Sequence, residues 1–169
     1  MKPGEQWWSF IDSYWDTVDI YNGGSTFITT FAKLPEPTAH LLALQWCNSE
    51  VCNGGFHQFF SNATGVLAPE AANAYHAIEM HDLAELVEAA IAVFPPPYPR
   101  EREERLAFLN SIPGSNREEW EEGDPFTAID TAYYEAKAIE ENRLENAADA
   151  YALRARAKML PPPTPQAAP

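Results

Sequence analysis

The side chains best suited to chemistry lie in one run of the 169-residue sequence, Glu50-Val51-Cys52-Asn53-Gly54-Gly55-Phe56-His57-Gln58-Phe59-Phe60-Ser61-Asn62. Glu50 is the one carboxylate of an otherwise apolar stretch, residues 38–51, so it must be hydrogen-bonded, neutralised or open to a cleft. A general base at Glu50 would need a second acid, a nucleophile or a metal, and the nearby candidates are Cys52 and His57. We favour a structural Glu50 whose carboxylate accepts hydrogen bonds from N–H groups that the glycine turn frees.

The residues Asn53-Gly54-Gly55-Phe56 predict a turn after this apolar stretch. Glycine permits a positive φ and a close backbone approach, and Asn53 tolerates the left-handed conformation or caps the next helix. Phosphate binding by such glycines requires a preceding strand and a nearby cation, and the sequence shows neither. Gln58 and Asn62 are four residues apart and face one side of a helix, where they either satisfy backbone groups of the turn or contact a ligand. We favour the first role.

Other candidate catalytic or metal-binding groups are sparse. The four histidines show no i, i+4 pairing with a further ligand, which is the usual spacing of a helical metal site: His40, His57, His76 and His81. We therefore predict no metal site and no cofactor, and we interpret the protein as non-enzymatic.

A second group of residues, Glu118-Glu119-Trp120-Glu121-Glu122, suits binding rather than catalysis. On a helix its four carboxylates share about 160° of the circumference, and Trp120 points the other way. They span about 6 Å along the axis, close to two ~3.4 Å phosphate steps of one DNA strand. An ordinary solvated helix face is the simpler interpretation of such a cluster. Further acids would extend the surface if the last helices pack beside it: Asp124, Asp130, Glu140, Glu141, Glu145 and Asp149.

The overall charge limits the class of partner. The chain carries 25 acidic and 11 basic residues, a formal net charge of -14, and residues 34–99 contain no Lys or Arg. Such a surface repels nucleic acid and anionic lipid, and it attracts basic proteins through a field that salt screens. We expect no direct nucleic-acid binding and no membrane partner. The start of the chain shows no secretory signal and no run is long enough to span a bilayer, so the sequence predicts a cytoplasmic protein.

The elements that position these residues are predicted to be helices. Apolar residues recur at three- and four-residue intervals, which indicates an all-α, single-domain compact bundle of roughly seven to nine helices over residues 1–160. The first helix is expected to end near Tyr21, and residues 38–51 to form a central buried helix. Asp82 and Asp124 are expected to cap the helices that follow them. Residues 161–169 are Pro-rich and predict a disordered tail.

The run from Glu50 to Asn62 resembles the Glu-Val-x-Asn-Gly-Gly-Phe-x-Gln-Phe/Tyr-Phe-x-Asn signature of a bacterial helical domain of unknown function, a family that includes an acidic DNA-mimic protein. The resemblance is specific over residues 40–65 and looser elsewhere. It implies an all-α fold, a cytoplasmic acidic protein without known catalysis, and a regulator that occupies the DNA-binding face of a repressor. It assigns no partner-contacting residue, so the acids named above come from the charge pattern alone.

Three functional hypotheses follow. The leading one is a non-enzymatic interaction protein whose carboxylates imitate the phosphate backbone and occupy the DNA-binding surface of a basic partner, such as a transcription regulator. The alternative is an immunity or antitoxin-type protein that neutralises a basic toxin or nuclease. A second alternative is a small-ligand binder or enzyme centred on Glu50, which requires a concave pocket that reaches this side chain. A homodimer is compatible with each of them.

Overall fold

The protein is all-α in the computed structural model, which describes residues 2–15, 19–21, 23–112 and 124–159. The eight α-helices of these residues fall within the predicted number, and two short 3₁₀ helices, η1 (Asp12–Tyr14) and η2 (Ala63–Leu67), join them. None of the described helices combines the length and apolar character that a bilayer span requires. The predicted tail, residues 161–169, lies outside the described residues. The α-helices are α1 (Glu5–Ile11), α2 (Gly24–Phe31), α3 (Glu36–Ser61), α4 (Ala68–Ala77), α5 (His81–Ile91), α6 (Arg102–Ser111), α8 (Thr127–Ala138) and α9 (Arg143–Met159).

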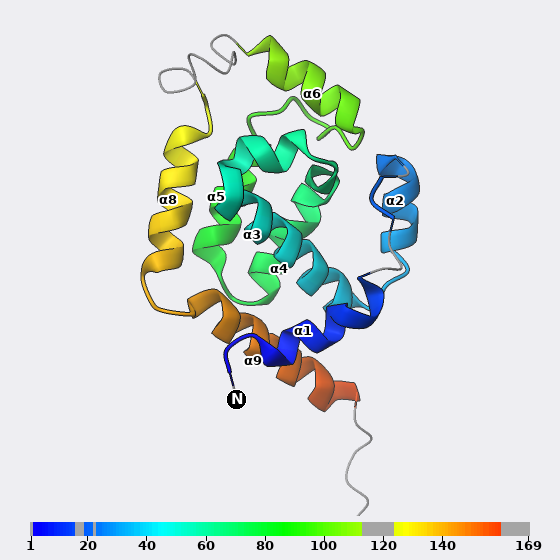
Figure 1. The fold of residues 1–169 in the computed structure, drawn as a ribbon, viewed down its shortest axis with the longest axis vertical. Helices are drawn as coiled ribbons and strands as arrows, with labels where there is room; N and C mark the ends of the chain where they lie inside the picture. Colours follow the sequence, from blue (N-terminus) through cyan, green and yellow to red (C-terminus); the bar gives the residue numbers. More distant parts are fainter. Residues whose placement is uncertain (1, 16–18, 22, 113–123, 160–169) are drawn as a thin grey trace, which may run out of the picture.

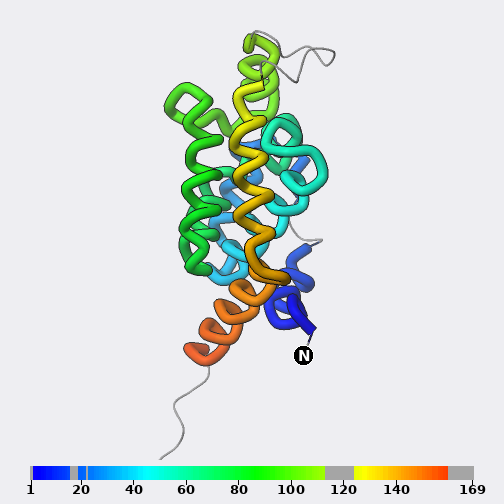
Figure 2. Tube along the Cα trace, turned by 90° about the vertical axis from the view of Figure 1, so that its left-hand side faces the viewer, coloured from blue at the N-terminus to red at the C-terminus, as the bar shows by residue number. Residues whose placement is uncertain are grey.

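Helix α3 occupies the centre of the bundle, as its apolar sequence predicts (Figure 1). Leu41, Leu42 and Val51 are fully buried, because a helix that is apolar on all sides must be covered on all sides. Helices α1 and α9 cross near one end of α3, and α6 lies near the other. Figure 2 shows α8 lying along the outside of the bundle, between α5 and the second half of α3.

The second half of α3 supplies the aromatic centre of the core. Phe56, Phe59 and Phe60 are fully buried. The ring of Phe60 lies 4.9 Å from that of Phe94, after α5, and 5.3 Å from that of Phe126, before α8. Buried aromatic pairs contribute about 0.5–1.5 kcal/mol beyond the area they bury. This cluster therefore joins three segments that are far apart in the sequence.

Two carboxylates cap helices at long range. Asp149 of α9 accepts hydrogen bonds from the N–H groups of Gly4, Gln6 and Trp7 at 2.8–3.0 Å. Glu101 accepts from the N–H groups at the start of α2, at 2.9 Å. Free N–H groups at a helix start favour a negative charge, so both acids hold a short peripheral helix in place.

Some helix boundaries differ from those predicted. The first helix ends at Ile11 instead of near Tyr21, and the chain tightens into η1. The apolar residues after Ile11 include Trp15, whose ring packs against Trp8 and Trp46 from outside the helix. Residue 80, not Asp82, precedes α5, and Asp82 instead binds Arg143 of α9 at 2.6 Å.

The cap expected at Asp124 is also displaced. Helix α8 begins two residues later than predicted, after Phe126. The Asp124 carboxylate accepts a hydrogen bond from the Phe126 N–H at 2.9 Å, so it closes a turn ahead of the helix.

A buried arginine binds the free carbonyl groups at the C-terminal end of α3. Arg105 of α6 is fully buried, and its guanidinium donates to the carbonyl groups of Phe60, Asn62 and Arg100 at 2.6–2.9 Å. Carbonyls at a helix C-terminus lack partners within the helix and carry partial negative charge. Burial nevertheless lowers the pKa of Arg105, because the charged form loses its hydration. A single side chain thus compensates several backbone carbonyls.

Arg105→Met should lower the free energy of unfolding by about 3 kcal/mol, because it leaves buried carbonyls without donors. Urea denaturation followed by circular dichroism measures the change. Arg102→Met on the same helix is the matched control: Arg102 is exposed and donates only to the Ser61 carbonyl, so the loss should stay under about 1 kcal/mol. Equal losses in the two variants would contradict this role for Arg105.

Candidate functional site

The glycine turn predicted from the sequence is a break inside α3. The backbone leaves the helix at Gly54, with φ -163° and ψ 30°, and at Gly55, with φ 72° and ψ -178°. The second conformation is open to glycine almost alone, because a β-carbon would collide with the backbone. Asn53 is exposed and keeps a helical conformation, so Gly55 rather than Asn53 adopts the positive φ.

Asp130 of α8 holds this break. Its carboxylate accepts a hydrogen bond from the Phe56 N–H at 2.8 Å. A β-carbon on Gly55 would clash with the same carboxylate, so glycine is needed there for space as well as for φ. One turn further along α8, the Tyr134 hydroxyl donates to the Val51 carbonyl at 2.6 Å. Helix α8 therefore satisfies one N–H after the break and one carbonyl before it.

The position of Asp130 raises its pKa to about 6 from the ordinary value of 3.8. Burial is the main cause, because it disfavours the charged carboxylate. The neighbouring charge of Asp124 also raises the pKa, and the Phe56 N–H lowers it. The Asp130 carboxylate therefore accepts a hydrogen bond inside the fold, and the loss of its hydration costs free energy.

Glu50 is hydrogen-bonded, but to other partners than the sequence suggested. Gln58 Nε2 and Asn62 Nδ2 each donate to Oε2 at 2.8 Å, and Thr64 Oγ1 donates to Oε1 at 2.9 Å. The prediction that Glu50 binds N–H groups of the turn is wrong, since Asp130 takes that role at Phe56. Gln58 and Asn62 do face one side, and the break turns that side toward Glu50. Their amide groups donate to this carboxylate, whereas the predicted role was to satisfy backbone groups of the turn.

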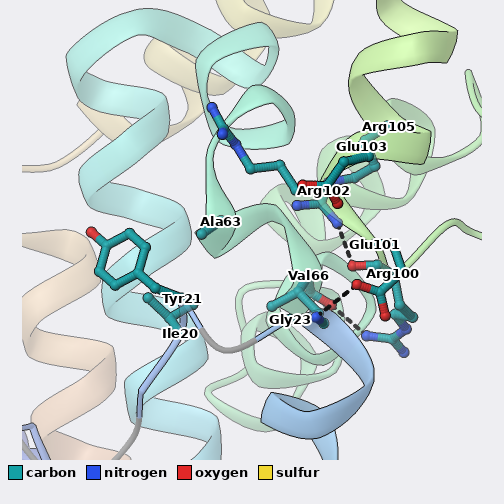
Figure 3. Close-up of a pocket in the computed structure, with 11 residues that line it drawn as sticks. Ile20, Tyr21, Gly23, Ala63, Val66, Arg100, Glu101, Arg102, Glu103 and Arg105 are labelled. Atoms are coloured by element: carbon teal, nitrogen blue, oxygen red, sulfur yellow. Dashed lines mark hydrogen bonds between the residues drawn. The ribbon is translucent and has the colours of Figure 1, made fainter.

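A cavity of about 260 Å³ reaches the Glu50 network. A smaller cavity of about 150 Å³ adjoins it and shares four of its lining residues, Ile20, Tyr21, Ala63 and Arg102 (Figure 3). The hypothesis of a small-ligand site at Glu50 requires such an opening. Of the other signature residues that could take part in such a site, Asn62 lines the cavity, whereas Asn53, His57 and Gln58 do not. The lining residues of the larger cavity are Ile20, Tyr21, Glu50, Asn62, Ala63, Thr64 and Arg102.

Among the acids predicted to bind a partner, those in the described part of the chain do not form one group. Glu118, Glu119, Glu121 and Glu122 lie outside the described residues. Asp124 precedes α8, and the exposed Glu140 and Glu141 follow it, so they lie at opposite ends of a helix about 18 Å long. Asp130 is turned toward the break. Between the two ends the exposed residues of α8 are mostly neutral: Thr127, Ala128, Thr131, Tyr134 and Ala138, with Glu135 as the acid.

Few of the described carboxylates form an ion pair with an arginine. Three ion pairs within the described residues join a carboxylate to an arginine: Glu70–Arg100, Asp82–Arg143 and Glu79–Arg154. Each pair links residues more than 29 positions apart in the sequence. These arginines therefore connect segments that are distant in the sequence, and most of the other described carboxylates remain exposed to solvent.

No group of three or more His, Cys, Asp or Glu side chains in the described part of the chain is arranged to hold a metal ion. The histidines have other contacts. His40 Nδ1 lies 2.7 Å from the Tyr151 hydroxyl, and His76 Nε2 lies 2.9 Å from the Glu88 carboxylate. Burial lowers the pKa of both His40 and His57, so burial favours their neutral forms.

Sequence reasoning missed five of the seven residues that line the Glu50 cavity, and three of the five are polar: Tyr21, Thr64 and Arg102. Thr64 follows the signature by two residues, which is a weak local signal. Tyr21 and Arg102 come from segments about 30 and 50 residues away from Glu50, and no spacing rule connects them with it. Only the folded chain brings these side chains to one cavity.

Comparison with known proteins gives one similarity. A family model described as DMP19-like protein matches residues 32–155, which include both halves of α3 and all later described helices up to the last turn of α9. No curated protein and no solved structure matches the chain.

Gly55→Ala should lower the free energy of unfolding by about 3 kcal/mol, since the new methyl group meets the Asp130 carboxylate at a positive φ. Gly54→Ala is the matched control. Its φ is not positive, and its methyl group would meet only the side chain of Gln58, most closely at the flexible amide end, so the cost should be about 1 kcal/mol. Urea denaturation tests both variants, and an equal cost would refute the special requirement at Gly55.

Asp130→Asn keeps an acceptor oxygen for the Phe56 N–H and removes the buried charge. Because the folded pKa is raised, the wild type binds more protons folded than unfolded between about pH 4 and pH 6. Its stability relative to the Asn variant should therefore fall as the pH rises through this window, by up to about 2 kcal/mol after allowance for solvent screening. Urea denaturation of both proteins from pH 4.5 to 7.5 measures the difference in their free energies of unfolding. A difference independent of pH would contradict the raised pKa of Asp130.

Proposed function

The chain belongs to the family of DMP19-like proteins, and from this premise we propose that it is a non-enzymatic interaction protein that occupies the DNA-binding surface of a basic partner, such as a transcription regulator. The observation that carries the proposal is the exposed, largely unneutralised carboxylate surplus on a helical scaffold of this family. Such a surface attracts a DNA-binding face through the same field that the phosphate backbone provides.

The distribution of charge supports this class of function. The chain has a formal net charge of -14, and within the described residues three arginines pair with carboxylates of distant segments. Most exposed acids of the described residues lie outside these arginine pairs, and their carboxylates can attract a partner's lysines and arginines. Long-range attraction of this kind raises the association rate and falls with ionic strength.

The proposed contact surface has two acidic parts. One comprises the Glu118–Glu122 cluster and Asp124, which precede α8 in the chain, and the other comprises Glu140 and Glu141, which follow it. The 18 Å length of α8 corresponds to about five base-pair steps of ~3.4 Å. Acids before and after α8 in the chain would then meet basic groups of the partner that lie several phosphate steps apart.

The arrangement at Glu50 supports the non-enzymatic part of the proposal. The carboxylate accepts three hydrogen bonds from neutral side chains, so it is less available as a base. The two candidate partners, Cys52 and His57, do not line its cavity. Cys52 Sγ instead lies 3.1 Å from Lys137 Nζ.

Affinity capture from a lysate of the source organism at low salt tests the proposal. The immobilised protein should retain at least one DNA-binding protein, and a DNA duplex carrying the partner's site should compete for it. Replacement of Glu118, Glu119, Glu121, Glu122, Glu140 and Glu141 by Gln should weaken binding of the purified partner at least tenfold, because it removes six attractive charges.

The matched control replaces six acids on other parts of the surface, Glu5, Asp12, Glu36, Glu85, Glu103 and Glu104, by the corresponding amides. The two variants have the same net charge. Equal weakening in both would show that total charge alone governs binding and would contradict a defined surface. Capture of a basic nuclease without any DNA-binding regulator would favour the immunity or antitoxin alternative.

A further inference from the structure

We propose that the cavity between Glu50 and Arg102 binds a small zwitterion of the α-amino acid class, with the ligand's ammonium group at Glu50 and its carboxylate at Arg102. This site involves the broken α3, η2 and the start of α6, whereas the proposed partner surface flanks α8 (Figure 1). The inference therefore goes beyond the proposed function and stands independently of it.

Glu50 presents a fixed negative charge to the cavity. Three neutral donors hold its carboxylate, and no cation among the described residues forms an ion pair with it. Neutral donors orient a carboxylate without cancelling its charge. Oε1 accepts only the bond from Thr64 and has capacity for a further donor. A ligand ammonium group supplies such a donor together with the opposite charge.

Arg102 presents the opposite charge to the same cavity. Its Nε donates to the Ser61 carbonyl at 2.7 Å, which fixes the side chain near the end of α3. Its guanidinium forms no ion pair with any acid of the described chain, although Glu101 and Glu103 are its neighbours in sequence. The terminal N–H groups of such a guanidinium match a carboxylate in a bidentate arrangement.

The remaining walls are consistent with a small ligand. Tyr21 and Arg102 lie on different sides of Ala63 in Figure 3, and both line the larger cavity as well as the adjoining one. The larger cavity, about 260 Å³, is below the ~300–1,000 Å³ typical of sites for drug-sized ligands. Ile20 and Ala63 provide apolar contact, and the ring of Tyr21, which is 87% exposed, lies at the rim.

The pair of charges determines the ligand class. A simple cation at Glu50 would also face the positive charge of Arg102, and a simple anion at Arg102 would face Glu50. Since a site discriminates through unpaired charges as well as through attractive contacts, each singly charged ligand is disfavoured. A ligand with both charges can pair with the Glu50 carboxylate and the Arg102 guanidinium at the same time.

Isothermal titration calorimetry of the full chain with each proteinogenic L-α-amino acid tests the inference. The matched probes are the amine that lacks the carboxylate and the acid that lacks the amine. At least one amino acid should bind at concentrations up to about 10 mM, and its two matched probes should bind at least tenfold more weakly. Failure of every amino acid to bind, or equal binding of a singly charged probe, would overturn the proposal.

Variants then locate the site. Glu50→Gln and Arg102→Met should each weaken binding at least tenfold, while Glu104→Gln, an exposed acid of α6 that lines neither cavity, should leave it within about twofold. Circular dichroism verifies the fold of each variant. If Glu50→Gln does not fold, a comparison of Arg102→Met with Arg102→Lys tests the site. Arg102→Lys keeps the positive charge and should retain part of the affinity for the amino acid, whereas Arg102→Met should not. Unchanged affinity in Arg102→Met would overturn the assignment. No basic partner is present in this assay, so its result is separate from that of the affinity capture.

Discussion

The break in α3 is the constraint on which the rest of the structure depends. Gly55 adopts a positive φ and leaves no room for a β-carbon beside the Asp130 carboxylate, which accepts the Phe56 N–H. This contact joins α8 to the centre of the bundle. The turn also directs the phenylalanines after it into the core and returns Gln58 and Asn62 to Glu50. A continuous helix would move these groups to other sides of the axis, since each residue rotates by about 100°.

The acidic residues divide into two populations with different physical roles. Asp149 and Glu101 cap helices, Asp130 holds the break, and Glu50 organises the polar cluster beside it. Each of these carboxylates compensates free donors that the fold creates. Most exposed acids of the described residues form no ion pair with an arginine, and they carry the surplus charge. Net charge alone therefore overstates the surface available to a partner, and the position of each carboxylate decides whether it belongs to the fold or to an interface.

The few arginines explain how so acidic a chain stays compact. Arg105 is buried against backbone carbonyls, and Arg100, Arg143 and Arg154 each pair with a carboxylate from a distant segment. These cations act across tertiary contacts, where charges lose part of their hydration and their hydrogen bonds gain strength. The self-repulsion of the remaining exposed acids is moderated by solvent and salt. A stable fold and a strongly negative surface are compatible because the arginines and their partners join segments of the fold, while the remaining exposed acids face solvent.

The sequence by itself determined the all-α class, the buried central helix, the break at the two glycines and the sign of the surface. These properties depend on local periodicity, on the conformational freedom of glycine and on composition, which the chain carries without any long-range contact. The tertiary structure alone decided that Asp130, rather than Glu50, accepts the freed N–H, that Asp82 pairs with Arg143, and that Tyr21 and Arg102 share a cavity with Glu50. A carboxylate has the same type and charge in each of these roles. Which donors reach it depends on how distant helices pack, and sequence spacing does not specify that packing.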